Sequence, residues 1–295
     1  MKRAKIGICG FGVMGKNHYR QLKKLNKADI PIIYDPKGGD CNGDYTQFLK
    51  DCKKLDGLII ASPTNTHVEN CVHALEQNPH LFILLEKPVD TIIERARTLL
   101  PHSDRILVGH LERFNPVIKK IKSLIDVGQI GKIISVNCKR VGNSPSRESI
   151  NVYEDLTVHD IDLCLYLLAS QSKESSNRTR NVNLYKSYSN INVELCDYST
   201  LTFNLGDCFC IIESSWLYPY KLRQIEILSE FGQYRGNLFE QTLLFCNKGG
   251  EEVSIQVENQ APLEGELEHF LSCIDDQSFP NVTVQDSINT LQFFQ

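Results

Sequence analysis

The sequence predicts an α/β fold in which an amino-terminal domain with a parallel sheet precedes an α+β domain with an open, mainly antiparallel sheet. Short apolar runs alternate with amphipathic helical segments over residues 4–109, which is typical of strands joined by helical crossovers. A glycine-rich turn follows the first run. Beyond residue 183, strand-like runs follow one another without intervening helices, which favours antiparallel pairing.

The composition excludes several classes of protein. The chain has 295 residues, of which 41% are hydrophobic and 23% charged, as in ordinary globular proteins. The net charge is −4 and no basic run is present, so we expect no nucleic-acid partner. No apolar stretch reaches the length of a membrane span, and the first residues do not resemble a signal peptide. We therefore expect a cytoplasmic protein that does not associate with membranes.

Eleven cysteines are scattered through the chain without a framework spacing. Cys208 and Cys210 are two apart and are expected on one face of a strand. No Cys-x-x-Cys motif occurs, so the pattern favours reduced, buried thiols and predicts no metal site.

A glycine-rich turn joins the first strand, Ala4–Cys9, to a helix that includes residues 18–25. In this context G-x-G-x-x-G is informative, because the first glycine permits a tight turn and the second lets a pyrophosphate approach the backbone. The third glycine permits close packing of helix and strand, and the helix amino terminus favours phosphate charge. The turn predicts a dinucleotide-binding (Rossmann) domain, with the cofactor held by Gly10, Phe11, Gly12, Val13, Met14 and Gly15.

Asp35 ends the second strand, residues 30–35. An acid at this position accepts hydrogen bonds from the adenosine ribose and repels a 2′-phosphate, so it favours NAD over NADP. Lys37 nearby weakens that preference. The alternative is that Asp35 is an ordinary turn residue before Pro36.

The alternation continues as far as Gly109. We predict helices over residues 44–53, from the 62–67 turn to 77, and 90–100, with strands at 57–61, 81–85 and 105–109.

The apolar run Ile83-Leu84-Leu85 ends abruptly at Glu86-Lys87-Pro88. Proline cannot donate to a sheet ladder, so the strand is expected to stop at Lys87. Open α/β sheets bind their ligands at the carboxyl ends of their strands, so Glu86 and Lys87 become candidate site residues. A solvated strand end is the alternative.

A series of motifs resembles the glucose-fructose oxidoreductase / inositol dehydrogenase (Gfo/Idh/MocA) family. In chain order the matching segments are Gly10-x-Gly12-x-x-Gly15, Ser62-Pro63-Thr64-x-x-His67, Glu86-Lys87-Pro88, Gly109-His110-x-x-Arg113-Phe114-x-Pro116 and Asp155-x-x-x-His159-Asp160-x-Asp162.

The resemblance implies NAD(P)-dependent oxidation of a sugar or polyol hydroxyl and a homodimer or homotetramer formed through the carboxy-terminal sheet. Lys87 and His159 match the family's catalytic lysine and histidine, and Asp155 matches the acid beside them. A cis peptide before Pro88 is also implied. On the cofactor side the resemblance adds Ser62, Pro63, Thr64, His67, Glu86 and Lys87.

Residue chemistry is consistent with these roles. Histidine titrates near working pH and suits the removal of a hydroxyl proton. On a helix that begins near Glu154, Asp155 and His159 share a face, with Asp162 on the same side. A lysine can stabilise charge that develops on the reacting oxygen. The alternatives are that Asp155 is a helix N-cap or a first-turn acid that complements the helix dipole, and that His159 is a core histidine.

Three segments look closest to UDP-N-acetylglucosamine 3-dehydrogenases: residues 113–116, 155–162 and 216–223. The resemblance makes Arg113, Asn115 and Tyr218 substrate-binding candidates beside Lys87, Asp155 and His159, with the diphosphate near Lys221 and Arg223. For Arg113 a solvated helix start is the alternative, and for the 218–223 segment ordinary surface charge. An inositol- or glucose-type substrate, or a non-catalytic NAD-responsive protein, also stays open.

The carboxy-terminal half predicts helices over residues 116–127, 156–169 and 264–274, a partial helix over 284–294, and a polar loop over 170–183. A strand is predicted at 131–141. Further strands are predicted at 183–188, 191–204, 208–216, 224–229, 241–246 and 252–256, in an antiparallel meander with one covered face. We predict domains at residues 1–114 and 115–282, with residues 283–295 a partial terminal helix that packs on the first domain.

Overall fold

The computed structural model describes residues 3–38, 41–143, 150–169, 179–189, 195–275 and 278–294. The chain divides into two compact units: one is Met1–Leu111 with Ala261–Gln295, and the other is Glu112–Gln260. Helix α7 (Pro262–Ile274) therefore belongs to the first unit, whereas the sequence placed it in the second. A Cβ atom at Gly57 would lie 2.6 Å from the Ile274 side chain, so the sheet of the first unit is shaped to receive this helix.

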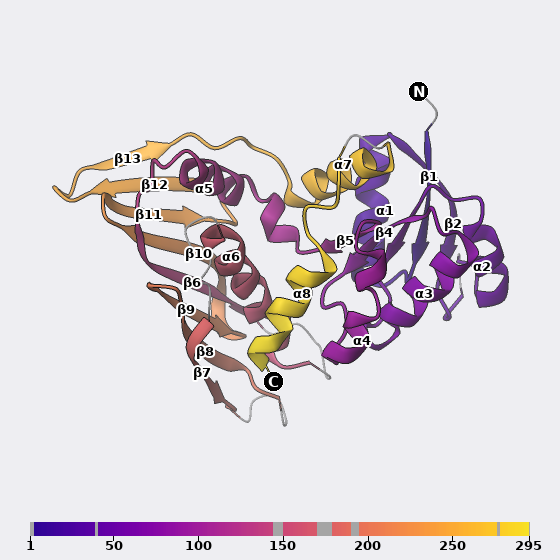
Figure 1. Cartoon of the computed structure of the whole chain (residues 1–295), viewed down its shortest axis with the longest axis horizontal. Coiled ribbons are helices and arrows are strands. Elements are labelled where there is room, and N and C mark those ends of the chain that lie inside the picture. The colour runs from indigo at the N-terminus through magenta and orange to yellow at the C-terminus, as the bar shows by residue number, and fades with distance from the viewer. Residues whose placement is uncertain are drawn as a thin grey trace. The chain divides into compact units, whose positions relative to one another are not determined.

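The first unit contains a five-stranded sheet of order β2-β1-β3-β4-β5, in which every neighbouring pair is parallel, as predicted (Figure 1). Strands β3, β4 and β5 are buried along their whole length, because helices cover both faces of a parallel sheet. The strands are β1 (Ala4–Cys9), β2 (Ala28–Tyr34), β3 (Gly57–Ile60), β4 (Phe82–Glu86) and β5 (Ile106–Gly109). The other helices of this unit are α1 (Val13–Leu25), α2 (Tyr45–Cys52), α3 (His67–Gln77), α4 (Ile93–Arg97) and α8 (Val284–Leu291).

Two of these helices are shorter than predicted. Helix α4 is followed by a 3-10 turn, Leu100–His102, that contains Pro101. Helix α8 begins with a capping box between Thr283 and Asp286 and passes into the 3-10 turn Gln292–Phe294. No helix in the described part of the chain has both the length and the hydropathy of a membrane span.

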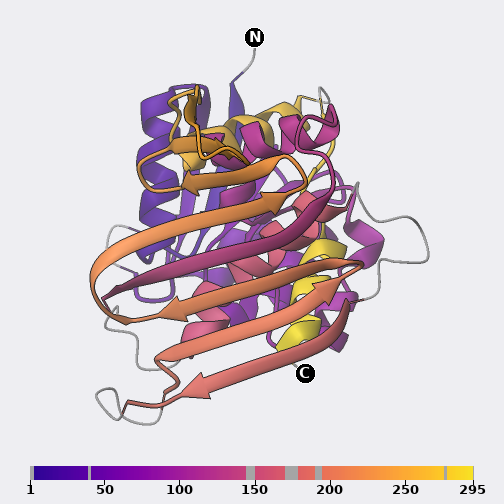
Figure 2. The same cartoon turned by 90° about the vertical axis from the view of Figure 1, so that its left-hand side faces the viewer.

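The second unit is built on an eight-stranded sheet of order β13-β12-β11-β10-β6-β9-β8-β7, whose strands lie side by side in Figure 2. The sheet is mainly antiparallel, as predicted, but strand β6 lies between β10 and β9 and pairs with β9 in parallel, so the strands do not form one continuous meander. Alternation of apolar and polar side chains in the sequence predicts a strand but does not predict which strands it pairs with. The strands are β6 (Ile133–Asn143), β7 (Thr179–Ser187), β8 (Tyr198–Leu205), β9 (Cys208–Ser215), β10 (Leu217–Ser229), β11 (Gly232–Asn237), β12 (Thr242–Asn247) and β13 (Glu252–Ile255).

Strand β11 was missed by the sequence analysis because its Gly-Gln-Tyr-Arg-Gly-Asn sequence has two glycines and few apolar residues. Of the predicted loop over residues 170–183, residues 170–178 lie outside the described residues, and the remainder belongs to β7. Residues 191–194 of another predicted strand also lie outside the described residues.

Two helices, α5 (Pro116–Asp126) and α6 (Val158–Leu168), cover one face of this sheet (Figure 1). A Cβ atom at Gly236 of β11 would lie 2.8 Å from Val117, which shows how closely α5 approaches the strands. On the opposite face the side chains of Phe209 and Leu228 are exposed. One covered face, as predicted, is therefore confirmed.

All eleven cysteines are free thiols, and nine of them are buried. Cys208 and Cys210 lie on one face of β9, as predicted. Burial raises the pKa of most of these thiols, and that of Cys9 rises to about 12. The nine buried thiols therefore act as small core residues.

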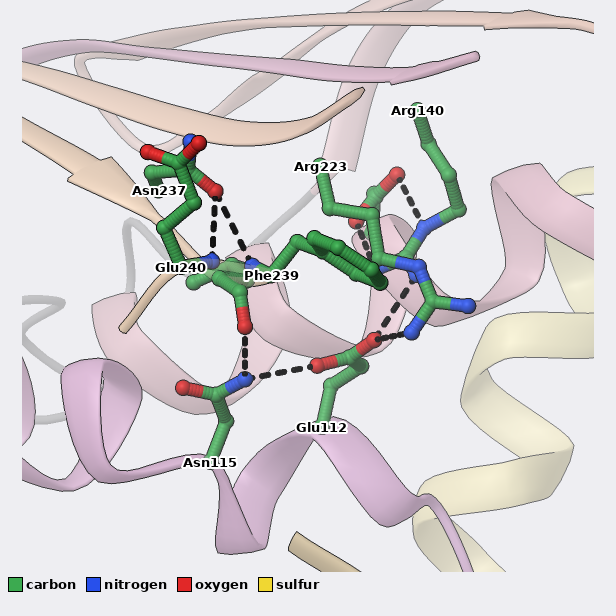
Figure 3. A network of polar contacts seen from close by, with 9 residues as sticks. Glu112, Asn115, Arg140, Arg223, Asn237, Phe239 and Glu240 are labelled. Atoms are coloured by element: carbon green, nitrogen blue, oxygen red, sulfur yellow. Dashed lines mark hydrogen bonds and ion pairs between the residues drawn. The ribbon is translucent and has the colours of Figure 1, made fainter. Parts of the chain in front are cut away.

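A network of buried charges joins α6 to the sheet beneath it (Figure 3). The Arg140 guanidinium donates to both carboxylate oxygens of Asp160, at 3.0 and 2.8 Å, and to Glu112 at 2.8 Å. Arg223 donates to the same Glu112 oxygen at 3.1 Å. Although burial opposes ionisation, Arg140 and Arg223 lower the pKa of Glu112. For Asp160 burial prevails over Arg140 and raises the pKa.

Replacement of Arg140 by methionine is expected to lower the free energy of unfolding by about 3–5 kcal/mol, because Glu112 and Asp160 are then left buried near each other without their main cation. Urea-induced unfolding measures the change. The matched control is Arg235→Met, which breaks a half-exposed pair with Glu252 and should cost at most about 1 kcal/mol. Equal stability of the two variants would contradict this account.

Candidate active site

The turn between β1 and α1 is held in a conformation that only glycine adopts without strain. Gly10 has φ +91°, and a Cβ atom there would lie 2.5 Å from the backbone nitrogen of Ser62. A Cβ atom at Gly15 would lie 2.0 Å from the Gly10 carbonyl oxygen. A Cβ atom at Gly12 would have no neighbouring atom within 4 Å, so the backbone is open where that atom would lie. A pyrophosphate group can approach there, at the amino terminus of α1.

Asp35 follows the last residue of β2 and faces the same turn. Its Oδ2 accepts a hydrogen bond from the Phe11 N–H at 2.8 Å, and its Oδ1 accepts one from the Lys37 N–H at 2.9 Å. A carboxylate has lone pairs beyond these two contacts, so it can also accept bonds from ribose hydroxyls. Asp35 is thus a turn residue and is also placed for the predicted contact.

A cavity of about 830 Å³ lies beside this turn, within the first unit. It is lined by six of the residues assigned to the cofactor from the sequence: Gly10, Phe11, Gly12, Asp35, Ser62 and Pro63. The other assigned residues are not among its lining residues: Val13, Met14, Gly15, Thr64, His67, Glu86 and Lys87.

Three lining residues that the sequence analysis missed form a polar chain with Ser62. Ser62 Oγ lies 2.8 Å from Thr66 Oγ1, and Asn70 Nδ2 donates to Ser62 Oγ at 3.0 Å. The Tyr45 hydroxyl donates to Asn70 Oδ1 at 2.8 Å. The sequence feature that could have revealed these residues is the spacing of Thr66 and Asn70, which lie four residues apart and so share a helix face.

His67 is buried and bridges two loops. Its Nδ1 lies 2.9 Å from the Pro88 carbonyl oxygen, and its Nε2 lies 2.8 Å from the Ser62 carbonyl oxygen. Burial lowers the pKa of His67, although both carbonyl oxygens oppose this shift. His67 therefore joins the cavity loop to the loop after β4, and its direct role in cofactor binding stays a prediction.

Lys87 stands at the carboxyl end of β4, half-buried, as the strand-ending motif predicted. The Lys87–Pro88 peptide bond is cis, which confirms the expectation from the resemblance. Glu86 points inward and accepts a hydrogen bond from His18 Nε2 at 2.7 Å. The alternative of a solvated strand end is wrong for Glu86, which is buried.

In the second unit, Asp155 and His159 lie where a π-helical turn, Tyr153–Thr157, leads into α6. Thr157 donates to Ser214 of β9 at 2.9 Å, which ties this turn to the sheet. The N-cap of this turn is Val152, so the N-cap alternative for Asp155 is wrong, whereas the position of Asp155 in the first turn fits the alternative of an acid that complements the helix dipole. Single π-turns inside helices often mark functional sites, and this one contains Asp155 and is followed closely by His159.

Asp162 does not belong to the π-turn that precedes His159. It forms a buried ion pair with Arg113. Arg113 donates from Nε to Asp162 at 2.8 Å and from Nη2 at 2.5 Å, and it stacks on Tyr166. A solvated helix start does not describe Arg113, which is 7% exposed. Because the guanidinium is held by Asp162, the geometry does not favour its predicted contact with substrate.

Asn115 is the amino-terminal cap of α5. Its Oδ1 accepts from the Val117 N–H at 3.1 Å. Its Nδ2 donates to the Leu238 carbonyl oxygen at 2.9 Å and to Glu112 at 3.2 Å (Figure 3). The side chain is buried and serves the fold, so its predicted contact with substrate is not favoured either.

Tyr218 belongs to a polar cluster with Lys139 and Glu213. Its hydroxyl donates to Glu213 at 2.9 Å, and Lys139 Nζ lies 3.1 Å from the same hydroxyl. Lys139 and Arg140 are consecutive on β6 and point to opposite faces, so this cluster lies on the sheet face away from α6. Its predicted role in substrate binding stays a prediction.

These features fit NAD. The open approach at Gly12, the acceptor at Asp35 and the adjoining cavity correspond to a pyrophosphate, a ribose and an adenine respectively. The fold and this site define an NAD-binding oxidoreductase of the Rossmann class.

Comparison with known protein families agrees with this class of protein. Residues 4–105 match the family model described as "Oxidoreductase family, NAD-binding Rossmann fold", and residues 118–235 match the model described as "GFO/IDH/MocA C-terminal domain". The chain belongs to the Gfo/Idh/MocA family of NAD-binding oxidoreductases.

Individual relatives are distant. The chain is 29% identical to the Bacillus subtilis protein named "Uncharacterized oxidoreductase YrbE", in a match that spans 59% of this chain and 56% of that protein. It is 25% identical to scyllo-inositol 2-dehydrogenase (NAD(+)) of the same organism, over 98% of this chain and 92% of that protein. Among solved structures, UDP-N-acetylglucosamine 3-dehydrogenase GnnA from Acidithiobacillus ferrooxidans has a TM-score of 0.83 at 19% identity, covering 99% of this chain and 95% of that one.

Replacement of Asp35 by alanine is expected to weaken NAD binding by about 10- to 100-fold, because the ribose loses its charged acceptor. NADP binding should weaken less, since a repulsion of the 2′-phosphate is removed at the same time. Calorimetric titration with each dinucleotide measures both changes. The control is Asp44→Ala, which removes the cap of α2 and should leave both affinities unchanged. Equal losses for NAD and NADP would contradict the assignment.

Proposed function

We propose that this protein is an NAD-dependent dehydrogenase that oxidises a ring hydroxyl, at C3, of a nucleotide sugar such as UDP-N-acetylglucosamine. The observation that carries the enzymatic part is the position of Lys87 at the carboxyl end of β4, in the same parallel sheet as the cofactor cavity. Ligands of open α/β sheets gather at this edge. A bound NAD supplies the acceptor for hydride.

Three side chains carry the proposed chemistry. Lys87 hydrogen-bonds the reacting hydroxyl and stabilises negative charge that develops on its oxygen. His159 accepts the hydroxyl proton. Asp155, held in the π-turn, orients the histidine or the substrate and favours the protonated imidazole.

The substrate class rests on the segments at residues 113–116, 155–162 and 216–223, which resemble UDP-N-acetylglucosamine 3-dehydrogenases. A second candidate is a free polyol, because the relative that matches nearly the whole chain is named a scyllo-inositol dehydrogenase. The two candidates differ in charge, since only a nucleotide sugar needs cationic contacts to a diphosphate.

Replacement of Lys87 by methionine is expected to lower kcat by about 100- to 1,000-fold, because one donor to the reacting oxygen is lost. Affinity for NAD should stay within a few-fold, because Lys87 is not among the residues that line the cavity. Formation of NADH from UDP-N-acetylglucosamine and from myo-inositol measures turnover and separates the two substrate classes. The control is Lys50→Met, an exposed lysine on α2.

Near-normal turnover by the Lys87 variant would overturn the catalytic assignment. If the wild-type protein formed no NADH with any sugar or polyol in a broad panel, the proposed activity itself would be wrong.

We also propose that the open face of the eight-stranded sheet joins subunits in a homodimer or homotetramer. Phe209 and Leu228 are exposed there, and both pair with Ser135 on the strand between them. Burial of such side chains favours association. Sedimentation should show an oligomer that Phe209→Glu/Leu228→Arg disrupts, whereas a monomeric wild-type protein would refute the proposal.

A further inference from the structure

Helix α7 carries a carboxyl group into the interior of the first unit. Glu266 is 1% exposed, and neither of its carboxylate oxygens has a hydrogen-bond partner among the described residues. An ionised carboxylate in such a place costs several kcal/mol, so a buried acid without partners calls for an explanation.

A second buried carboxyl group lies near it. Glu86, the last residue of β4, accepts the 2.7 Å hydrogen bond from His18 of α1. A carboxylate only accepts, so the proton of this bond is on Nε2 of the imidazole. A Cβ atom at Gly109 would lie 3.3 Å from Glu86 Oε2, so the glycine at the end of β5 leaves room for this carboxylate.

The two carboxyl groups prefer opposite protonation states. Burial opposes ionisation of Glu86, but the hydrogen bond and charge of His18, together with the charge of Lys87, lower its pKa. Burial, reinforced by the charge of Glu86, raises the pKa of Glu266 well above its ordinary value. Two acids whose surroundings separate them in this way are the usual arrangement where one group must hold charge and the other a proton.

We propose that His18, Glu86 and Glu266 form a buried positioning device for Lys87. In it the Glu86 carboxylate is the counter-ion of the Lys87 ammonium group, and His18 fixes the direction of that carboxylate. Glu266 places a neutral carboxyl group behind the pair, so that no second negative charge competes for the ammonium. The proposal rests on the catalytic role given to Lys87 above.

The device also joins the cofactor helix to the catalytic strand. His18 lies on α1, the helix whose amino terminus faces the cofactor turn, and Glu86 lies next to Lys87. A displacement of α1 therefore changes the place of the Lys87 counter-ion. Neither His18 nor Glu266 lines the cofactor cavity, so both act through Glu86.

The charged groups around these acids are few. His67 of α3 acts on Glu86 beside His18 and Lys87, whereas the charged group found to act on Glu266 is Glu86. The other acids of α7 contact lysines elsewhere: Glu264 contacts Lys24 of α1, and Glu268 contacts Lys27, which follows α1. Glu266 therefore titrates mainly against Glu86.

The first test compares Glu266→Gln with the wild-type protein in urea unfolding at several pH values. The folded wild-type chain keeps a proton that the unfolded chain releases above the ordinary value of 4.5. Wild-type stability should therefore fall, relative to the variant, as pH rises. The ratio of the two unfolding constants should change about tenfold per pH unit until Glu266 ionises. The control is Glu268→Gln on the same helix, which should show no such slope. Parallel curves for Glu266→Gln and wild type would overturn the neutral state of Glu266.

The second test measures kcat against pH. Glu86→Gln keeps the shape of the side chain and removes its charge, so kcat should fall about 10- to 100-fold while the Kd for NAD stays within about threefold. The profile should also move to lower pH, because an ammonium group without its counter-ion loses a proton more readily. The alkaline limb of Glu266→Gln should extend to higher pH than that of the wild type, since no second charge can form.

The positioning role of His18 is tested by rescue. His18→Gln retains a donor and should keep more activity than His18→Leu, with both variants assayed beside Lys87→Met. A wild-type profile in Glu86→Gln, with Lys87→Met inactive, would overturn the positioning device and leave the proposed function standing. An active Lys87→Met would overturn both.

Discussion

The close approach of the β1–α1 turn to β3 is the constraint on which the first unit depends. A side chain at Gly10 would collide with the backbone of Ser62, and a side chain at Gly15 would collide with Gly10 itself. Because both positions are glycine, α1 can begin directly at the sheet edge. The same approach brings His18 of α1 within hydrogen-bond distance of Glu86 on β4, which is two strands from β1 in the sheet order. The cofactor turn and strand β4 are therefore parts of one packed arrangement.

The second unit depends on charge rather than on close backbone contact. Arg140, at the centre of the sheet, holds α6 through Asp160 and the segment before α5 through Glu112. Arg113 holds α6 a second time through Asp162. Such pairs add little net stability over apolar packing, but they penalise any other placement of the helix. The π-turn that contains Asp155 leads directly into the helix that these pairs hold.

This arrangement explains why residues of the same motif have different roles. Asp160 and Asp162 flank Ile161 close to His159, and each neutralises an arginine from another element. Asp155 is held by the turn itself. Asp160 and Asp162 therefore fix the helix, and among the acids of this motif Asp155 is the one to which we assign a role beside the histidine.

Most of the fold followed from local patterns. Fully apolar runs predicted the buried parallel strands, and the spacing of glycines predicted the cofactor turn, because each depends on residues adjacent in the chain. Strand β11 and the place of β6 between β9 and β10 did not follow, since pairing depends on partners distant in sequence. The sequence analysis did not place α7 in the first unit for the same reason, because this packing also depends on residues distant in sequence.

For the site, the sequence by itself supplied the candidates for the chemistry: Lys87 at a strand end, Asp35 after β2, and the pair Asp155 and His159. Only the tertiary structure decided which polar residues are already occupied. Arg113 and Asn115 looked available, yet one is paired with Asp162 and the other caps α5. The structure alone also placed Glu266 near Glu86, 180 positions earlier in the chain. The physical reason is that charge and hydrogen bonding act through space, so their partners are set by packing and not by spacing along the chain.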